Sequence, residues 1–322
     1  MDDATGSAAS PNTADSIEKM CSAHKPIGTT ARFPDGTIFG DWRLTAFIGR
    51  GGNGEVYCAE HVTLGTPAAV KVLMRDDERA KVRFEREAKL LAKLKSAAFP
   101  RFFTYGETGS TAYLAMELLE PSELPAGDRA VAAFMLKVCD AVEELHALGY
   151  VHRDIKPSNI LWRSSSEPVL ADLGLVKSLD SSNSPTPTPT LQLQLLVKSL
   201  DSSDPQTFKS SDAPVTLGGV GTPGYGAPEQ MERGEVSFAA DIHALGVLAD
   251  RCFNGKPPPA WTRIIRRATS SIPALRYPSV AMFAHAIRWR NLWRNVGMTV
   301  LIMFLIGLFI DIVIVGIVIW LW

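Results

Sequence analysis

The residues best suited to chemistry lie in one short stretch, HRDIKPSN, at 152–159. It carries a carboxylate (Asp154), two cations (Arg153 and Lys156) and a carboxamide (Asn159). A single aspartate on a loop is usually a solvated surface residue, whereas this concentration of acid, cations and amide is typical of a site that handles a charged substrate. The stretch follows a long helical pattern that ends at Gly149, so a helix must deliver it.

A second charge stands out because it lies in an apolar run. Lys71 sits in AAVKV, and a buried lysine needs a carboxylate or phosphate partner. The predicted helix 80–95 offers one. Phe84 and Leu91 mark its apolar stripe, and Glu87 stands three residues after the first and four before the second. Glu87 therefore faces inward and is the predicted partner of Lys71.

A glycine-rich stretch, IGRGGNGEV at 48–56, places Gly49, Gly51 and Gly54 between two strand-like runs. Glycines let the backbone approach an anion and present N–H donors without an obstructing Cβ. The pattern alone is weak, because a glycine-rich hairpin has the same sequence signature. A strand rather than a helix follows it, which argues against a dinucleotide-binding Rossmann turn.

The elements that must position these residues form two groups. Strand-like alternation comes first and helical periodicity dominates later, which predicts an α+β fold with two lobes. The predicted strands are 42–49, 55–62, 68–74 and 112–119, and the predicted helices are 80–95 and 129–148.

Composition narrows the class of protein. The 322 residues carry 33 Lys and Arg against 34 Asp and Glu, so no nucleic-acid partner is expected. The four cysteines are scattered without a CxxC pair, which predicts reduced thiols and neither a structural metal nor a disulfide framework. Residues 1–40 are polar, lack the apolar run of a signal peptide and are expected to be disordered.

The C-terminal segment 296–322 has the composition of a transmembrane helix. Between Val300 and Ile319, 16 of 20 residues are Leu, Ile, Val or Phe, and such a helix matches the roughly 30 Å hydrocarbon core. Asp311 would cost about 3 kcal/mol, which the roughly −5 to −10 kcal/mol of the apolar residues outweighs. Arginines and tryptophans in RWRNLWRN, 288–295, mark the cytoplasmic side. A single-pass membrane protein with its N-terminal part in the cytoplasm is therefore expected.

Two weaker expectations concern contacts of this segment. Gly307 and Asp311 lie four residues apart on one helix face and could support weak homo-association, although Gly316 lies on the opposite face. The arginines before the segment are a solvated flank that could also draw the chain to anionic membrane lipid.

Five motifs in this order resemble those of a eukaryotic-like (Hanks-type) Ser/Thr protein kinase of the bacterial branch. The resemblance covers about 41–290 and implies a protein-kinase-like fold, with a β-rich N-lobe at 41–119 and a helical C-lobe at 120–290. It implies transfer of the γ-phosphoryl group of ATP, with Mg²⁺, to Ser or Thr of protein substrates, and autophosphorylation. The motifs are GRGGNGEV (49–56), AAVK (68–71), HRDIKPSN (152–159), ADLG (171–174) and GTPGYGAPE (221–229).

The resemblance gives the matching polar residues their roles. Asp154 would accept the proton of the substrate hydroxyl, and Lys156 would steady the transferred phosphoryl group. Asn159 and Asp172 would hold Mg²⁺, which prefers hard oxygen ligands. Lys71, held by Glu87, would contact the α- and β-phosphates.

The same resemblance implies an adenine pocket and structural braces. Met116 would be the gatekeeper, and Glu117 and Leu119 would offer hinge backbone; ordinary core packing explains each apolar position equally well. Asp241 would brace the catalytic loop, Arg276 would pair with Glu229, and His152 would be a packing residue. The remaining implied ATP contacts are Ile48, Gly49, Gly51, Gly54, Val56, Ala69 and Leu161.

An unusual segment separates Asp172 from Glu229, where the resemblance places the activation segment. LVKSLDSS at 175–182 recurs at 196–203, with a Pro/Thr alternation between the copies, so 178–215 reads as a low-complexity insert. A surface loop tolerates such an insert at modest entropic cost. Thr216 and Thr222 are the candidate regulatory sites, and a phosphate there could pair with Arg153. A tandem duplication without function is the alternative.

Some features depart from the family pattern. DLG stands where DFG is usual, and Asn53 occupies the tip of the glycine-rich loop. The stretch 255–271 leaves little room for the helix and loop with which many kinases dock substrates. A catalytically weak, pseudokinase-like scaffold that binds ATP therefore remains an alternative. An ATP-dependent small-molecule phosphotransferase is disfavoured by GTPGYGAPE, which resembles a platform for peptide substrates.

Overall fold

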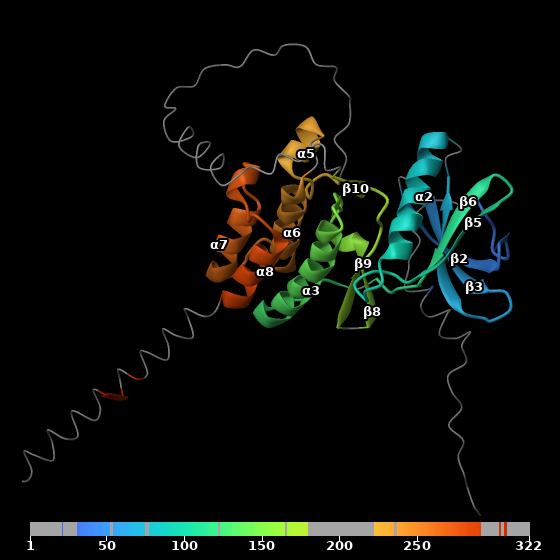
Figure 1. Cartoon of the computed structure of the whole chain (residues 1–322). Helices are drawn as coiled ribbons and strands as arrows, with labels where there is room; N and C mark the ends of the chain where they lie inside the picture. The colour runs from blue at the N-terminus through green and yellow to red at the C-terminus, as the bar shows by residue number, and fades with distance from the viewer. Residues whose placement is uncertain are drawn as a thin grey trace, which may run out of the picture.

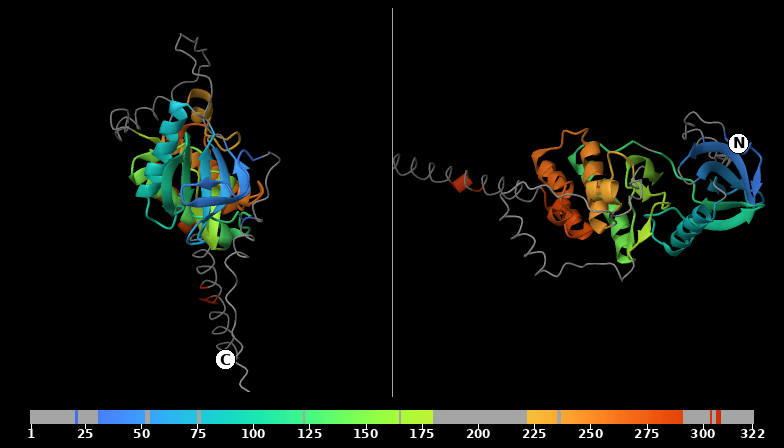
Figure 2. Two further views of the ribbon diagram at one scale, coloured as in Figure 1. Left: turned by 90° about the vertical axis from the view of Figure 1, so that its right-hand side faces the viewer. Right: turned by 90° about the horizontal axis from the view of Figure 1, so that it is seen from above.

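The computed structural model describes residues 31–51, 54–74, 77–121, 123–164, 166–179, 222–234 and 237–290, together with Cys21, Met303, Ile306 and Gly307. A strand-rich lobe and a helical lobe lie side by side, and the chain between them carries the hairpin of β8 and β9 (Figure 1). Seen from above, the two lobes occupy opposite ends of the described chain (Figure 2). The predicted two-lobed α+β class is confirmed.

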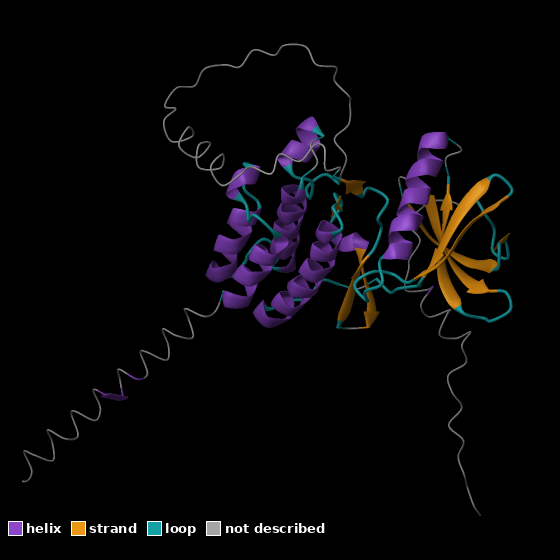
Figure 3. Ribbon diagram, in the orientation of Figure 1, coloured by secondary structure: helices purple, strands orange, loops and turns teal. Residues whose placement is uncertain are grey.

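The small lobe is one antiparallel sheet with a single long helix beside it (Figure 3). The helix, α2 (Glu78–Lys93), lies against β4 and β5. In spatial order the strands are β1 (Ile38–Phe39), β2 (Trp42–Arg50), β3 (Gly54–His61), β4 (Pro67–Leu73), β6 (Thr111–Met116) and β5 (Phe102–Thr108).

Helix α2 begins two residues before the predicted start because Asp77 caps it. The Asp77 carboxylate accepts the N–H of Ala80 at 2.7 Å, which satisfies one of the free donors of the first turn. The predicted inward stripe is confirmed, since Phe84, Glu87 and Leu91 are all buried. The helix thus fixes Glu87 against the sheet.

The large lobe packs four helices around one core. Helix α3 (Asp128–Ala147) contacts α6 (Phe238–Cys252) and α8 (Val280–Trp289), and α7 (Pro259–Ala268) packs on α6. Trp261 of α7 is fully buried, and its indole N–H donates to Asp128 at 2.7 Å. The short α5 (Pro228–Arg233) precedes α6.

Short elements between these helices carry the polar motifs. The 3₁₀ turns are η1 (Pro157–Asn159) and η2 (Pro273–Leu275), and the strand pairs are β7 (Tyr150–Val151) with β10 (Lys177–Ser178) and β8 (Ile160–Ser164) with β9 (Glu167–Leu170). Gly149, at φ 78°, takes the left-handed conformation that ends α3 and turns the chain into β7. The HRD and DLG motifs therefore lie at the ends of neighbouring short strands.

The N-terminal boundary differs from the prediction. Residues 31–40 were expected to be disordered, but they pack on the outer face of the sheet. The N–H of Arg32 donates to the buried Glu55 carboxylate at 3.2 Å, and the ring of Phe33 packs edge-on against Phe39. Two aromatic rings and a buried carboxylate give this segment enough contacts to order it.

The expectation of four reduced cysteines is wrong for one pair. Cys21 and Cys58 form a disulfide across 37 residues, with Cα atoms 6.0 Å apart. Spacing in sequence gave no sign of it, because the pair depends on where the N-terminal segment returns to the sheet. Cys139 and Cys252 are buried free thiols, and burial raises the pKa of Cys252 to about 12.

Other sequence predictions fall on residues outside the described part. They are most of 1–40, most of the insert 178–215, Thr216, and the segment 296–322 apart from Met303, Ile306 and Gly307. Within the residues that the structure describes, no helix combines the length and apolar character needed to cross a bilayer.

Candidate active site

Lys71 links the two lobes at the predicted site. Lys71 of β4 donates to Glu87 Oε1 of α2 at 2.7 Å and to Asp172 Oδ1, just after β9, at 3.0 Å. Lys71 and Glu87 are buried, whereas 47% of the Asp172 side chain is exposed. The predicted pairing of Lys71 with Glu87 is confirmed, and the contact with Asp172 brings the AAVK and ADLG motifs together.

This cluster sets the charge of its members. The Lys71 ammonium lowers the pKa of Asp172 to about 2, so this carboxylate is ionised at neutral pH. Burial alone would lower the pKa of Lys71, but the carboxylates of Glu87 and Asp172 outweigh it and raise that pKa. An ammonium and an exposed carboxylate therefore stand side by side.

Two motif residues have left-handed backbones. Arg153 has φ 71° and Asp172 has φ 56°. Such conformations cost on the order of 1–3 kcal/mol for residues other than glycine and persist where surrounding contacts fix them. For Asp172 these contacts are Lys71 and the N–H of Gly174, which donates to Oδ1 at 3.4 Å. The backbone turn aims the carboxylate at Lys71.

The predicted catalytic residues form one hydrogen-bonded group. Asn159 Nδ2 donates to the Asp154 carbonyl at 2.8 Å and to Asp154 Oδ2 at 2.9 Å. Lys156 Nζ lies 2.7 Å from Asp154 Oδ2. Thr222 completes the group, because its hydroxyl donates to Asp154 Oδ1 at 2.7 Å and accepts from Lys156 Nζ at 2.6 Å. Thr222, predicted as regulatory, thus lies against Asp154, the predicted catalytic aspartate.

Asp241 of α6 fixes the loop that contains His152, Arg153 and Asp154, as predicted. Its fully buried carboxylate accepts the N–H of His152 and the N–H of Arg153, both at 2.8 Å. His146 of α3 reaches the same carboxylate at 2.8 Å. His152 is fully buried, and burial lowers its pKa, which agrees with a packing residue rather than a general base.

The glycines of 48–56 serve different purposes. A Cβ on Gly54 would meet the Val72 carbonyl oxygen at 2.5 Å, so packing against β4 requires this glycine. A Cβ on Gly49 would meet nothing within 4 Å, so packing does not explain it. Gly49 stays a predicted ATP contact, where a glycine would let the ligand approach the backbone, whereas Gly52 and Asn53 lie outside the described residues.

The predicted adenine contacts of the small lobe share one face of the sheet. Val56 is paired with Lys71, and Met116 is paired with Ala69, which lies two residues before Lys71 on β4. Paired residues, and residues two apart on one strand, point to the same face of a sheet, so all three side chains lie on the face that carries Lys71. Ile48, Val56 and Met116 pack in one apolar cluster with Ala69. Leu161, on β8 of the large lobe, is half-buried.

The hinge holds a brace that the sequence did not indicate. Arg163 of β8 donates to both carboxylate oxygens of Glu117 at 2.8 Å and to the carbonyl of Ala97 at 2.7 Å. Partial burial acts to raise the pKa of Glu117, but Arg163 and the N–H of Arg101 outweigh it and lower that pKa. Glu117 thus fixes the hinge by its side chain. Leu119, the other predicted hinge residue, is buried beside it.

The closing motif is anchored as predicted. Glu229 accepts two hydrogen bonds from Arg276, at 2.6 and 2.8 Å, and both residues are buried. Gln230 of the same short helix donates to the Arg153 carbonyl at 2.8 Å. The end of the activation segment is therefore tied both to the lobe's C-terminal part and to the catalytic loop.

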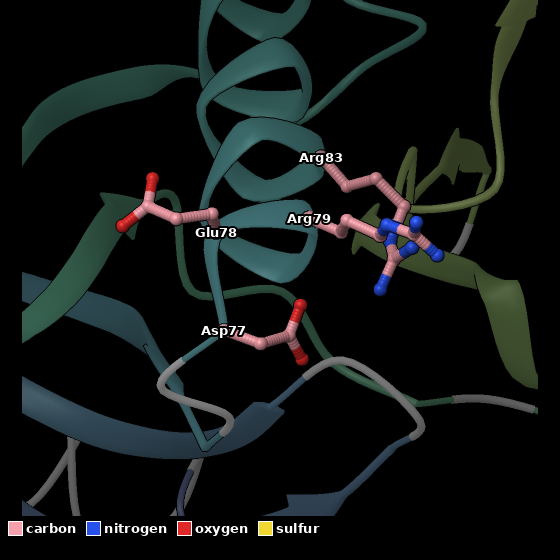
Figure 4. A pocket seen from close by; sticks show the side chains of 4 residues that line it. All are labelled: Asp77, Glu78, Arg79 and Arg83. Atoms are coloured by element: carbon pink, nitrogen blue, oxygen red, sulfur yellow. The ribbon is translucent and has the colours of Figure 1, made fainter.

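A further pocket lies at the start of α2 and is lined by Asp77, Glu78, Arg79 and Arg83 (Figure 4). Arg79 and Arg83 are one helical turn apart, and their guanidinium groups lie next to each other. Glu78 points to the opposite side of the helix, whereas the Asp77 carboxylate extends to the side on which the guanidinium groups lie. Two adjacent cations suit an anionic group such as phosphate.

A family model described as "protein kinase domain" matches residues 42–277. The chain belongs to the protein kinase family. This confirms the family inferred from the five motifs, and the match begins one residue after the predicted domain start.

Curated relatives agree with the bacterial branch. The serine/threonine-protein kinase Pkn1 of Myxococcus xanthus is 32% identical over 293 residues, which cover 79% of this chain and 38% of that protein. PknH of Mycobacterium bovis is 30% identical over 236 residues, which cover 69% and 34%. The chain therefore spans little more than a third of the length of these relatives.

Solved structures support the fold. A double-mutant form of the Mycobacterium tuberculosis PknI kinase domain matches with a TM-score of 0.57 and 21% identity, over 81% of this chain and 99% of that one. A single-mutant form matches with a TM-score of 0.56 and 23% identity. These similarities show the kinase fold alone.

The site fits Mg²⁺ and ATP, as the kinase family implies. Asn159 donates through Nδ2 to Asp154, which leaves its amide oxygen to face a cation. Asp172 is ionised, gives Oδ1 to Lys71 and is half exposed. An amide oxygen and a carboxylate are hard ligands suited to Mg²⁺. Lys71 would face the phosphates, and the Ile48, Val56 and Ala69 face would take the adenine.

Proposed function

We propose that this chain is an ATP-dependent protein-serine/threonine kinase. The observation that carries this proposal is the position of the Thr222 hydroxyl, hydrogen-bonded at once to Asp154 and Lys156. A Ser or Thr hydroxyl from a substrate would need these same two partners, a carboxylate to accept its proton and a cation beside the transferred group.

The chain's own residues account for the reaction in this order. Lys71, fixed by Glu87, would hold the α- and β-phosphates, and Asn159 and Asp172 would hold Mg²⁺, which would neutralise phosphate charge. Asp154 accepts the proton of the attacking hydroxyl at its carboxylate. Lys156 stabilises negative charge on the transferred phosphoryl group. Asp241 keeps Asp154 in place throughout.

Phosphate transfer from labelled ATP to the chain itself and to an added protein acceptor tests this function. We expect Asp154→Asn to abolish transfer while ATP binding persists. Asp140→Asn is the matched control, because Asp140 lies on the same lobe with 63% of its side chain exposed. Equal transfer by wild type and Asp154→Asn would refute the assignment.

One observation keeps the scaffold alternative in view. Only Phe253–Pro258 separate α6 from α7, so no helix of substrate-docking size fits between them. A scaffold would bind ATP, as Lys71 and Asp172 allow, without transfer to any protein. The transfer experiment therefore separates the two functions.

Autophosphorylation is part of the proposal. The Arg153 Nε is buried and has no hydrogen-bond partner among the described residues. A phosphate on the activation segment would supply an acceptor for it, and Arg79 and Arg83 form a second cationic group. Site mapping by mass spectrometry should find phosphate at Thr216 or on Thr186, Thr188 or Thr190 in wild type and none in Asp154→Asn.

We also propose that residues 296–322 anchor the kinase domain to the cytoplasmic face of a membrane. Support comes from the apolar run 300–319 and the arginine-rich flank before it. The full chain should sediment with membranes and resist high-salt extraction, whereas a chain that ends at residue 295 should remain in the supernatant. Identical distributions would rule the anchor out.

A further inference from the structure

The Cys21–Cys58 disulfide lies on the face of the small-lobe sheet that carries Lys71, where the nucleotide site is proposed. Cys58 pairs in register with Ala69, and Val56 pairs with Lys71, on the same two strands. Because side chains alternate along a strand, Val56 and Cys58 point to one side, as do Ala69 and Lys71. Lys71 reaches Asp172 of the other lobe from this side. Cys58 therefore faces the nucleotide site.

The disulfide brings Cys21 onto the surface that adenine needs. Cys58 is fully buried and Ala69 is 7% exposed, in a cluster against which Cys21, Ile48, Val56 and Met116 pack. Four of these residues, Ile48, Val56, Ala69 and Met116, are the predicted small-lobe contacts of the adenine ring. The contacts of Cys21 and those of adenine therefore overlap.

We propose that the Cys21–Cys58 pair is a redox latch on ATP binding. When the bond is formed, Cys21 covers the face predicted to contact adenine and ATP is excluded; when the bond is reduced, Cys21 leaves this face and ATP binds. This inference rests on the nucleotide site of the proposed function. In reducing compartments, disulfides are usually transient and redox-sensing, which suits a latch better than a structural staple.

The latch opens by thiol–disulfide exchange with two equivalents of a low-molecular-weight thiol. The first thiolate attacks the partly exposed Cys21 sulfur, because Cys58 is buried, and the bond to Cys58 breaks. Cys58 leaves as a thiolate and takes a proton. The second thiol displaces Cys21 from the mixed disulfide, which gives two protein thiols and one small disulfide. An excess of small disulfide reverses both steps.

The other two cysteines provide an internal control. Cys139 and Cys252 are buried in the large lobe, and burial raises the pKa of both thiols, which keeps them protonated and unreactive. A redox response should therefore depend on Cys21 and be independent of Cys252.

The test is the affinity of the full chain, in detergent, for a fluorescent ATP analogue at fixed ratios of reduced to oxidised glutathione. Peptide mapping follows the disulfide in the same samples. We expect oxidised wild type to bind at least tenfold more weakly than reduced wild type, with recovery on reduction. Oxidised Cys21→Ser should bind like reduced wild type, and Cys252→Ala should respond as wild type does.

Three results would overturn the latch. One is unchanged affinity in oxidised protein whose Cys21–Cys58 peptide has been mapped. Another is failure of that peptide to form at any glutathione ratio. The third is absence of binding by reduced, folded wild type, which would remove the ATP site as well and so differs from failure of the latch alone. Circular dichroism of Cys21→Ser confirms that the variant is folded.

Discussion

Replacement of Asp241 by asparagine tests how far the position of Asp154 depends on the hydrogen bonds that Asp241 makes to the backbone of the loop before it. It removes such a bond and leaves Asp154 itself unchanged. The buried carboxylate uses both oxygens, Oδ1 for the N–H of Arg153 and Oδ2 for the N–H of His152 and for His146. Asparagine has a single oxygen and turns an NH₂ group toward one of these donors. The better orientation keeps the oxygen at the position of Oδ2 and faces the NH₂ group to Arg153.

The cost follows from this geometry. Asp241→Asn loses one hydrogen bond to a charged acceptor and leaves the partly buried N–H of Arg153 unpaired, which together lower the free energy of unfolding by about 2–3 kcal/mol. Arg153 also loses a contact that fixes its left-handed backbone, so Asp154 should shift. A misplacement of about 1 Å at a reacting group can cost on the order of 10²-fold in rate.

Urea unfolding and single-turnover phosphate transfer measure the two effects separately. Transfer should be measured where circular dichroism shows the variant folded, so that lost stability does not register as lost rate. Asp140→Asn, on an exposed side chain of α3, should change neither quantity by a comparable amount. A folded Asp241→Asn protein with wild-type stability and wild-type transfer rate would refute the reasoning.

Three further predictions concern the small lobe and its cluster. Glu87→Gln should lower kcat/KM for ATP at least tenfold by loosening Lys71, whereas Glu85→Gln, on the exposed face of α2, should not; equal effects in steady-state kinetics would contradict the pairing. Gly54→Ala should cost about 1–3 kcal/mol in thermal unfolding, because its Cβ would meet a carbonyl of β4 at 2.5 Å; Gly49→Ala should leave stability unchanged and weaken ATP binding. Because the folded-state pKa of Asp172 is lowered to about 2 from 3.8, its contribution to stability is present above about pH 4 and lost as the pH falls toward 2. Urea unfolding of wild type and Asp172→Asn should therefore converge between pH 4 and pH 2.

The sequence located the polar centre well because each member belongs to a short local pattern. Glu87 could be assigned from helical spacing, and Asp154, Lys156 and Asn159 share one eight-residue stretch. Their partners across the fold, Asp241 and Arg276, were placed only through the family resemblance, because nothing local links them to the loop.

The features that could not be predicted from the sequence are contacts between residues far apart in the chain. Arg163 reaches Glu117 across 46 residues, and Cys21 reaches Cys58 across 37. In each case the contact forms only because the fold brings two distant parts of the chain together, and the local spacing of residues in the sequence does not indicate it. The polar composition of 1–40 likewise masked Phe33 and Phe39, whose packing extends the small lobe.

On the proposed function, the residues for phosphoryl transfer make their contacts away from the part of the large lobe where the chain is short. Lys71, Asp172 and Asp154 depend on β4, α2, β9 and the loop held by Asp241, and none of these contacts involves α7 or α8. The link from α6 to α7 is short, so the large lobe lacks the substrate-docking surface that many kinases have there. The contacts of Lys71, Asp172 and Asp154 do not depend on that surface. Trp261 closes that side of the lobe by hydrogen-bonding to Asp128 beneath Arg290. On the proposed function, the activation segment, which contacts Asp154 through Thr222, is the part of the chain best placed to influence how a substrate hydroxyl reaches Asp154.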